Sequence, residues 1–148
     1  MSQSPPSSAA PGPRGGDDAP VPGARLGLPA AGRGAVAGWP RRLLGLAVDW
    51  ALATLIGRAF LAEALGRDFA PLAVFALMHL LLVATLGTSI GHAVAGVVVR
   101  RVDAPRPVGP LRAAVRTLLL VLVVPAAVWD ADRRGLHDKA AGTVVVRR

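Results

Sequence analysis

Residues 39–65 read WPRRLLGLAVDWALATLIGRAFLAEAL, and this stretch decides the fold. A tryptophan, a helix-starting proline and two arginines stand directly before the apolar run Leu43–Leu65. At about 1.5 Å of rise per residue, this run is long enough to cross a hydrocarbon core of about 30 Å. The stretch therefore predicts a membrane-spanning helix, although it contains Asp49, Arg58 and Glu63.

A second apolar run follows the short polar turn of residues 66–68 and extends from Phe69 to Leu86. It carries no formal charge and is interrupted by His79, so it predicts a second span over 69–86. Two spans joined by a short turn form a helical hairpin whose outer ends lie on the same side of the membrane.

The third apolar segment, residues 111–129, is predicted to be a short or re-entrant helix. Its uncharged part begins only at Thr117, which leaves too few residues for a full crossing, and Pro125 should kink or break the helix. A full crossing would also carry the C-terminal basic residues to the outside, against the positive-inside rule. We therefore favour re-entry, with a single crossing of a locally thinned bilayer as the alternative.

Two short β-branched segments have nearly the same sequence, GVVVRR over residues 96–101 and GTVVVRR over residues 142–148. An isolated strand would leave backbone groups unpaired, so the two segments are candidates to pair as a small β ribbon at the cytoplasmic face. The predicted fold class is an all-α membrane protein with a transmembrane hairpin, a third short or re-entrant helix and this ribbon.

The composition also indicates a membrane protein. The 148 residues are 53% hydrophobic before the 17 glycines are counted, against about 45–50% with glycine in soluble domains. The absence of cysteine excludes disulfides, thiolate metal sites and cysteine nucleophiles. The net charge of +8 comes from arginines that cluster before the first span, after the hairpin and at the C-terminus. These clusters contain no aromatic residues, so nucleic-acid binding is not expected.

The placement of the arginines predicts the location and orientation of the chain. By the positive-inside rule, the N-terminus is expected in the cytoplasm, and the protein is expected as a multi-pass protein of the inner (plasma) membrane. Its first expected partner is the bilayer, with an anionic inner leaflet beside the arginines.

Residues Met1–Gly38 are dominated by proline, glycine, alanine and serine. Such a stretch cannot bury enough apolar surface to offset the entropy lost on ordering. We expect it to be a disordered cytoplasmic tail, and residues 39–148 to form the transmembrane domain.

Asp49 is the most informative polar residue of the first span. Arg42 precedes it by two helical turns, so the two residues share one face of the helix. A carboxylate at this depth costs about 2.5–3.5 kcal/mol unless it finds a partner. We expect Arg42, or an arginine of the C-terminal segment, to pair with it. Two roles stay open: a structural tie between helices, or an ion or proton relay.

Three polar residues, Arg42, Asp49 and Asp138, carry a resemblance to a known family. The segments 39–49, WPRRLLGLAVD, and 133–146, RRGLHDKAAGTVVV, resemble the opening and closing motifs of the RDD family of small bacterial membrane proteins. The family is named for an arginine and two aspartates. The resemblance implies a small multi-pass membrane protein for which transport is often proposed.

The segment of residues 87–96, GTSIGHAVAG, is similar to the central glycine motif of that family. Where the family usually carries a basic pair, this chain has His92 and Ala93. The supporting positions that the resemblance assigns are Gly91, Gly96, Arg134, His137, Gly142 and Thr143.

No catalytic arrangement is visible in the sequence. His79, His92 and His137 lie on different segments without ligand spacing, so we expect neither a metal site nor a cofactor. No serine or cysteine nucleophile accompanies His137 and Asp138, so an enzyme is not expected. The hypothesis is a membrane protein that assists transport or complex assembly, as a homo-oligomer or with membrane-protein partners. The alternative is an oligomeric ion or proton-coupled transporter that uses Asp49.

Overall fold

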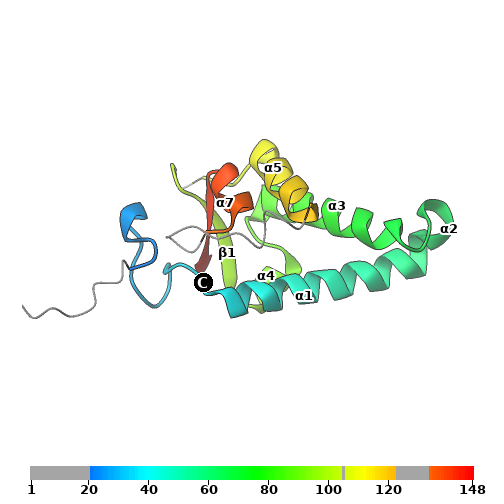
Figure 1. The fold of residues 1–148 in the computed structure, drawn as a ribbon, viewed down its shortest axis with the longest axis horizontal. Helices are drawn as coiled ribbons and strands as arrows, with labels where there is room; N and C mark the ends of the chain where they lie inside the picture. Colours follow the sequence, from blue (N-terminus) through cyan, green and yellow to red (C-terminus); the bar gives the residue numbers. More distant parts are fainter. Residues whose placement is uncertain (1–20, 105, 123–133) are drawn as a thin grey trace, which may run out of the picture.

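The computed structural model describes residues 21–104, 106–122 and 134–148 (Figure 1). They form a mostly helical fold with a small two-stranded sheet. In chain order the elements are η1 (Ala24–Leu26), α1 (Trp39–Ile56), η2 (Gly57–Leu61), α2 (Ala62–Leu65), α3 (Phe69–Leu86), α4 (Ile90–Val94), β1 (Val97–Arg101), α5 (Pro110–Val121), α7 (Leu136–Ala140) and β2 (Thr143–Arg147).

Two long helical segments form the hairpin. The first is continuous from Trp39 to Leu65 through α1, the π-helical η2 and α2, and the second is α3. Both are long and apolar enough to span a membrane, which agrees with the predicted spans. The π-helical turn begins at Gly57, where an added Cβ would lie 2.6 Å from Pro71 N. This glycine therefore lets the two segments approach closely near the α2 end.

The predicted pairing of the two β-branched segments is confirmed. β1 and β2 pair antiparallel, with Val97 opposite Arg147 and Arg101 opposite Thr143. A short helix precedes each strand, α4 before β1 and α7 before β2. These elements lie toward the end of the hairpin opposite α2 (Figure 1). We call α4, β1, α7 and β2, together with residues 34–37, the cap.

Residues 34–37 lie beside β2, within the stretch expected to be disordered. Their backbone forms three hydrogen bonds with β2, each 2.9 Å long, and Val36 forms a bridge with Val146. The expectation of disorder up to Gly38 therefore does not hold here, because the free edge of β2 offers unpaired backbone groups within reach. The same expectation for residues 1–20 lies outside the described residues.

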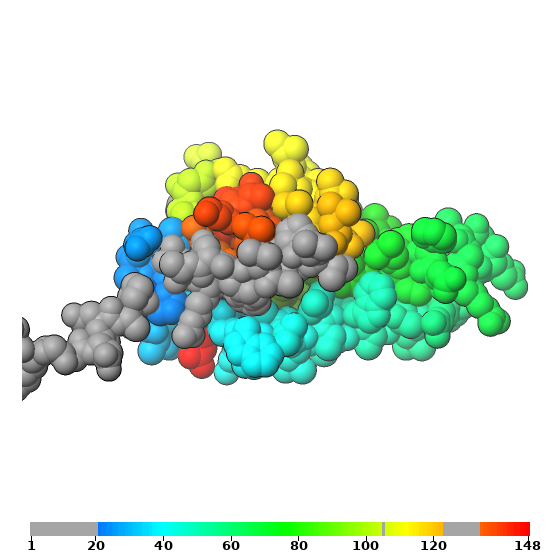
Figure 2. All heavy atoms as spheres, in the orientation of Figure 1, coloured from blue at the N-terminus to red at the C-terminus, as the bar shows by residue number. Residues whose placement is uncertain are grey.

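Helix α5 begins at Pro110, one residue before the third apolar segment, and packs against α3. Its Ala113 is buried with Val83 and Val108 in the core where α3 and α5 meet the sheet. Figure 2 shows that the cap and α5 cover one half of the hairpin, while the half that ends in α2 extends beyond them. The predicted break at Pro125 lies outside the described residues.

Candidate functional site

Most of the buried charged and histidine side chains lie where the hairpin meets the cap and α5. No member of this set is more than 8% exposed. The side chains form two groups, which we call the arginine clamp (Arg42, Arg116 and Asp138) and the Asp49 cluster (Asp49, His79, Ser89 and His92).

The arginine clamp joins three helices that are far apart in the sequence. Arg42 of α1 donates from Nη1 to Asp138 Oδ2 of α7 at 2.9 Å, and Arg116 of α5 forms an ion pair with Asp138 Oδ1. Thr143 Oγ1 also donates to Asp138 Oδ1, at 3.2 Å. The carboxylate is fully buried and has two cations and a hydroxyl around it. The clamp therefore fixes α7, and with it the cap, onto α1 and α5.

The expected ion pair between Arg42 and Asp49 is wrong. Arg42 pairs with Asp138 instead, and no arginine within the described ranges lies within ion-pair distance of Asp49. The reason is that the two residues lie at different positions along α1. Arg42 lies near the start of the helix, where the cap supplies a carboxylate, whereas Asp49 lies about 10 Å further along, where α4 packs.

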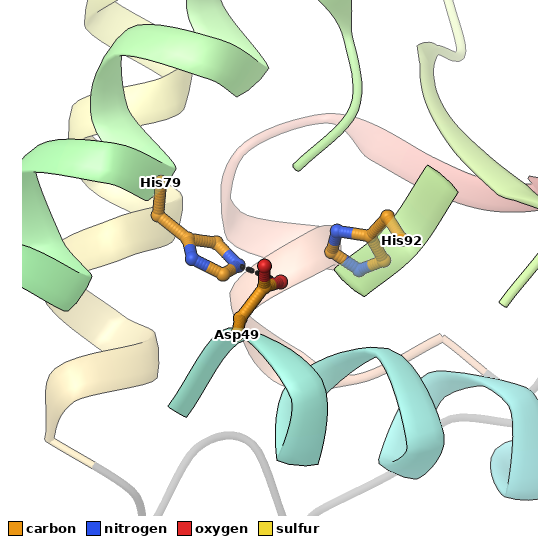
Figure 3. Close-up of side chains that lie close together, drawn as sticks. All are labelled: Asp49, His79 and His92. Carbon is orange, nitrogen blue, oxygen red and sulfur yellow. Dashed lines mark ion pairs between the residues drawn. The ribbon is translucent and has the colours of Figure 1, made fainter. Parts of the chain in front are cut away.

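Asp49 takes its hydrogen bonds from the loop and helix that follow α3. Gly91 N donates to Asp49 Oδ1 at 2.7 Å, and the Ser89 hydroxyl donates to Asp49 Oδ2. His79 of α3 approaches the same carboxylate, with Nε2 3.7 Å from Oδ2 (Figure 3). Three segments of the chain therefore converge on this one carboxylate.

Helix α4 is held against α1 by the close approach of two glycines. A Cβ added at Gly91 would overlap Gly45 O and lie 2.8 Å from Asp49 Cγ, so a larger residue does not fit without a backbone shift. Ser89 is the N-cap of α4, and its hydroxyl accepts a hydrogen bond from His92 N at 3.2 Å. This capped turn presents the serine hydroxyl to Asp49, and the His92 ring lies near the same carboxylate (Figure 3).

The His92 ring is neutral and has a defined tautomer. Its Nδ1 lies 2.6 Å from Ser89 Oγ. Because the serine proton is donated to Asp49, Nδ1 is the donor in this contact, and the lone pair lies on Nε2. Burial lowers the pKa of His92 well below its usual range, and the Arg116 guanidinium adds to this effect.

His79 is the member of the Asp49 cluster whose polar atoms lack partners. Its side chain is 1% exposed, and neither ring nitrogen forms a hydrogen bond within the described part of the chain. The Phe75 ring lies 4.4 Å away between centroids, and the His92 ring 5.6 Å away. A buried polar group left unpaired costs about 1–3 kcal/mol, so this side chain needs an explanation.

A cavity of about 60 Å³ lies between the arginine clamp and the Asp49 cluster. Side chains of both groups line this cavity, a proximity that sequence spacing did not indicate. Its polar lining residues are Arg42, His79, His92, Arg116 and His137.

The glycines of the central and closing motifs occupy equivalent turns. Gly96 joins α4 to β1 and Gly142 joins α7 to β2, with φ of 68° and 62°. A guanidinium donates to the carbonyl just before each glycine, from Arg41 at 3.1 Å and from Arg112 at 3.2 Å. The near-repeat seen in the sequence is therefore a repeated helix–glycine–strand unit.

The other predicted positions separate between the two groups. Gly91 belongs to the surroundings of Asp49, whereas Thr143 and His137 lie against Asp138, with His137 Nε2 3.6 Å from Asp138 Oδ2. Arg134 directly precedes the Gly135 N-cap of α7.

The sequence reasoning missed Arg116 and Ser89 and treated His79 as an ordinary histidine. Arg116 follows Arg112 by one helical turn, which could have placed it on the inward face of α5. Ser89 precedes a short apolar run, which is the usual N-cap position. Nothing in the sequence spacing of Asp49 and His79 indicates that they meet.

Comparison with protein-family models, with curated proteins and with solved structures gives no match for this chain.

Proposed function

We propose that the chain is an integral membrane protein that works as a subunit of a larger membrane assembly and assists transport or the assembly of its partners. The main supporting observation is that large apolar side chains of the hairpin are exposed while charged side chains are buried. Leu55, Phe60, Leu77 and Leu81 are exposed on the two long helices, whereas the charged arginine clamp is buried. The most apolar stretches of the two helices are only 22% and 28% buried. Such a surface needs lipid or partner helices around it.

The paired strands support a topology with two spans. β1 and β2 form one sheet, so they lie on one side of any membrane, and the chain between them crosses it an even number of times. A single crossing by residues 111–129 does not meet this condition, whereas re-entry does. Together with the positive-inside rule, the even number of crossings supports a cytoplasmic location for the cap and the N-terminus, with the hairpin in the plasma membrane.

Membership of the RDD family is part of this proposal. Arg42 and Asp138 are the first and last of the three motif residues. They form an ion pair although they lie 96 positions apart in the sequence, which supports a common structural role for them. Asp49, the middle residue, lies in the separate Asp49 cluster. In this reading the motif holds a cytoplasmic cap on a membrane hairpin and performs no catalysis.

Photocrosslinking in native membranes tests the assembly role. A photoreactive phenylalanine analogue at Leu77, which is 57% exposed, should give a discrete adduct with another copy of the chain or with a second membrane protein. The same analogue at Phe75, which is 3% exposed, is the matched control and should give none. Lipid adducts alone at Leu77, Leu81 and Leu55 would contradict a subunit role.

A second function, ion or proton-coupled transport by an oligomer, is favoured by the surroundings of Asp49. This fully buried carboxylate within the first candidate span has a hydroxyl, a backbone N–H and an imidazole around it, and no arginine of the described residues within ion-pair distance. Proteoliposomes of the purified chain should then show ion- or pH-dependent flux that Asp49→Asn abolishes. Absence of flux with folded protein would remove this candidate.

A further inference from the structure

His79 is a buried polar side chain that neither the arginine clamp nor the assembly role explains. Both of its ring nitrogens are buried without a hydrogen-bond partner in the part of the chain that the structure describes. The ring lies beside the Asp49 carboxylate and faces the ring of His92 edge-on (Figure 3). Two imidazoles and a carboxylate meeting in a buried place are the donors of a metal site.

We propose that Asp49, His79 and His92 bind one divalent transition-metal ion of the zinc type. One possible ligand atom from each residue lies within 4.8 Å of the other two. His79 Nε2 and Asp49 Oδ2 are 3.7 Å apart. Tetrahedral bonds of about 2.0–2.1 Å separate neighbouring ligands by about 3.3 Å, so a small inward movement of the side chains closes the group on an ion.

The kind of ligand selects the class of metal. Imidazole suits zinc, cobalt, nickel and iron, whereas magnesium and calcium take shells made of oxygen atoms. The Ser89 hydroxyl contacts both Asp49 Oδ2 and His92 Nδ1 and so helps to orient these two side chains. The chain has no cysteine, so the two imidazoles and the carboxylate are the ligands available to a borderline ion at this place.

Some charges around the site favour the binding of a cation and others oppose it. Asp49 supplies a buried negative charge without an arginine partner among the described residues, and a cation offsets it. Arg42 and Arg116 line the neighbouring cavity and oppose a second cation. Both guanidiniums pair with Asp138, which reduces their repulsion of an ion at Asp49. The balance favours a single ion held by two neutral imidazoles and one carboxylate.

The ligands come from three elements, α1, α3 and the short α4. An ion there would tie the cap to both helices of the hairpin, at a point separate from the arginine clamp. Because a metal that binds the folded state stabilises it by mass action, zinc should raise the melting temperature of the protein. This inference depends on neither the assembly role nor the transport role.

Metal titration of the whole chain tests the proposal. The protein is purified in detergent with a histidine-free tag and stripped with a chelator, and then titrated with Zn²⁺ by calorimetry and with Co²⁺ by its visible spectrum. We expect one ion per chain, a higher melting temperature with Zn²⁺, and no such effect of Mg²⁺. His79→Leu and His92→Gln should each weaken binding at least tenfold. His137→Gln changes the remaining histidine of the chain, which lines the same cavity, and should leave binding intact.

Three outcomes would overturn the proposal. These are no binding to wild-type protein that remains folded by circular dichroism, equal binding by wild type and by folded His79→Leu and His92→Gln, and equal loss of binding in His137→Gln. If His79→Leu does not fold, His92→Gln provides the same comparison, because this ring lies on α4 at the edge of the site. Failure of metal binding would leave the crosslinking at Leu77 unchanged, so the two proposals fail independently.

Discussion

Replacing Asp138 by asparagine tests the arginine clamp. Asp138→Asn keeps the size of the side chain but removes the charge that Arg42 and Arg116 share. Asp138 is fully buried and Arg116 is 2% exposed, so solvent does not screen the loss. Removing one partner of a buried ion pair costs about 3–5 kcal/mol. We expect the free energy of unfolding to fall by this amount, measured by SDS-induced unfolding in mixed micelles followed by tryptophan fluorescence.

An exposed carboxylate that also pairs with two arginines provides the control. Asp103 pairs with Arg101 and Arg112, each at 2.8 Å, but its side chain is 49% exposed. Asp103→Asn should change stability little, because exposed ion pairs are screened. In a double-mutant cycle, Arg116→Met and Asp138→Asn together should cost clearly less than the sum of the two single losses. Equal losses for the Asp138 and Asp103 variants, or strict additivity in the cycle, would refute the clamp.

Three further predictions follow from the Asp49 cluster. Arg42→Gln and Asp49→Asn should have nearly additive effects on the free energy of unfolding, within about 0.5 kcal/mol, and strong coupling would restore the rejected ion pair. Gly91→Ala should cost about 1–3 kcal/mol by the same unfolding assay, because its Cβ would overlap α1. Gly38→Ala, whose Cβ would meet only Pro40 Cδ at 3.6 Å, should cost less, and equal losses would contradict the close approach. With a chelator present, the free energy of unfolding should fall below pH 6.5 by up to about 1.4 kcal/mol per pH unit, because His92 binds a proton in the unfolded chain but not in the folded one. His92→Gln should make this slope shallower, and an unchanged slope would contradict a neutral His92 ring.

The long elements could be predicted because they depend on local composition. The run without formal charge from Phe69 to Leu86 predicts a helix with the same bounds as α3. The repeated GVVVRR and GTVVVRR segments predict a ribbon, because two unpaired strands of like sequence need a partner. The short helix α4 was missed, since its five residues give no periodic signal and depend on the Ser89 cap and on packing against α1.

The candidate site could be predicted only in part. Its place within the first apolar run identified Asp49 as a candidate site residue, and helical spacing placed Arg42 on the same face. Arg42 pairs with Asp138, 96 positions away, and Asp49 contacts α4, about 40 positions away. One sequence does not encode such contacts as a spacing. The same limit hid the meeting of His79 and His92, which spacing alone had argued against.

Cysteine labelling in intact cells tests the two-span hairpin with its cap on one side most directly. The chain has no cysteine, and Ala31, Arg67 and Ala140 are exposed positions before the hairpin, at its turn and in the cap. Single Ala31→Cys, Arg67→Cys and Ala140→Cys variants are treated with a membrane-impermeant thiol reagent before and after permeabilisation. We expect Arg67→Cys to react in intact cells and the other two variants to react only after permeabilisation. Labelling of Ala140→Cys in intact cells, or equal labelling of all three variants, would contradict the two-span hairpin with its cap in the cytoplasm.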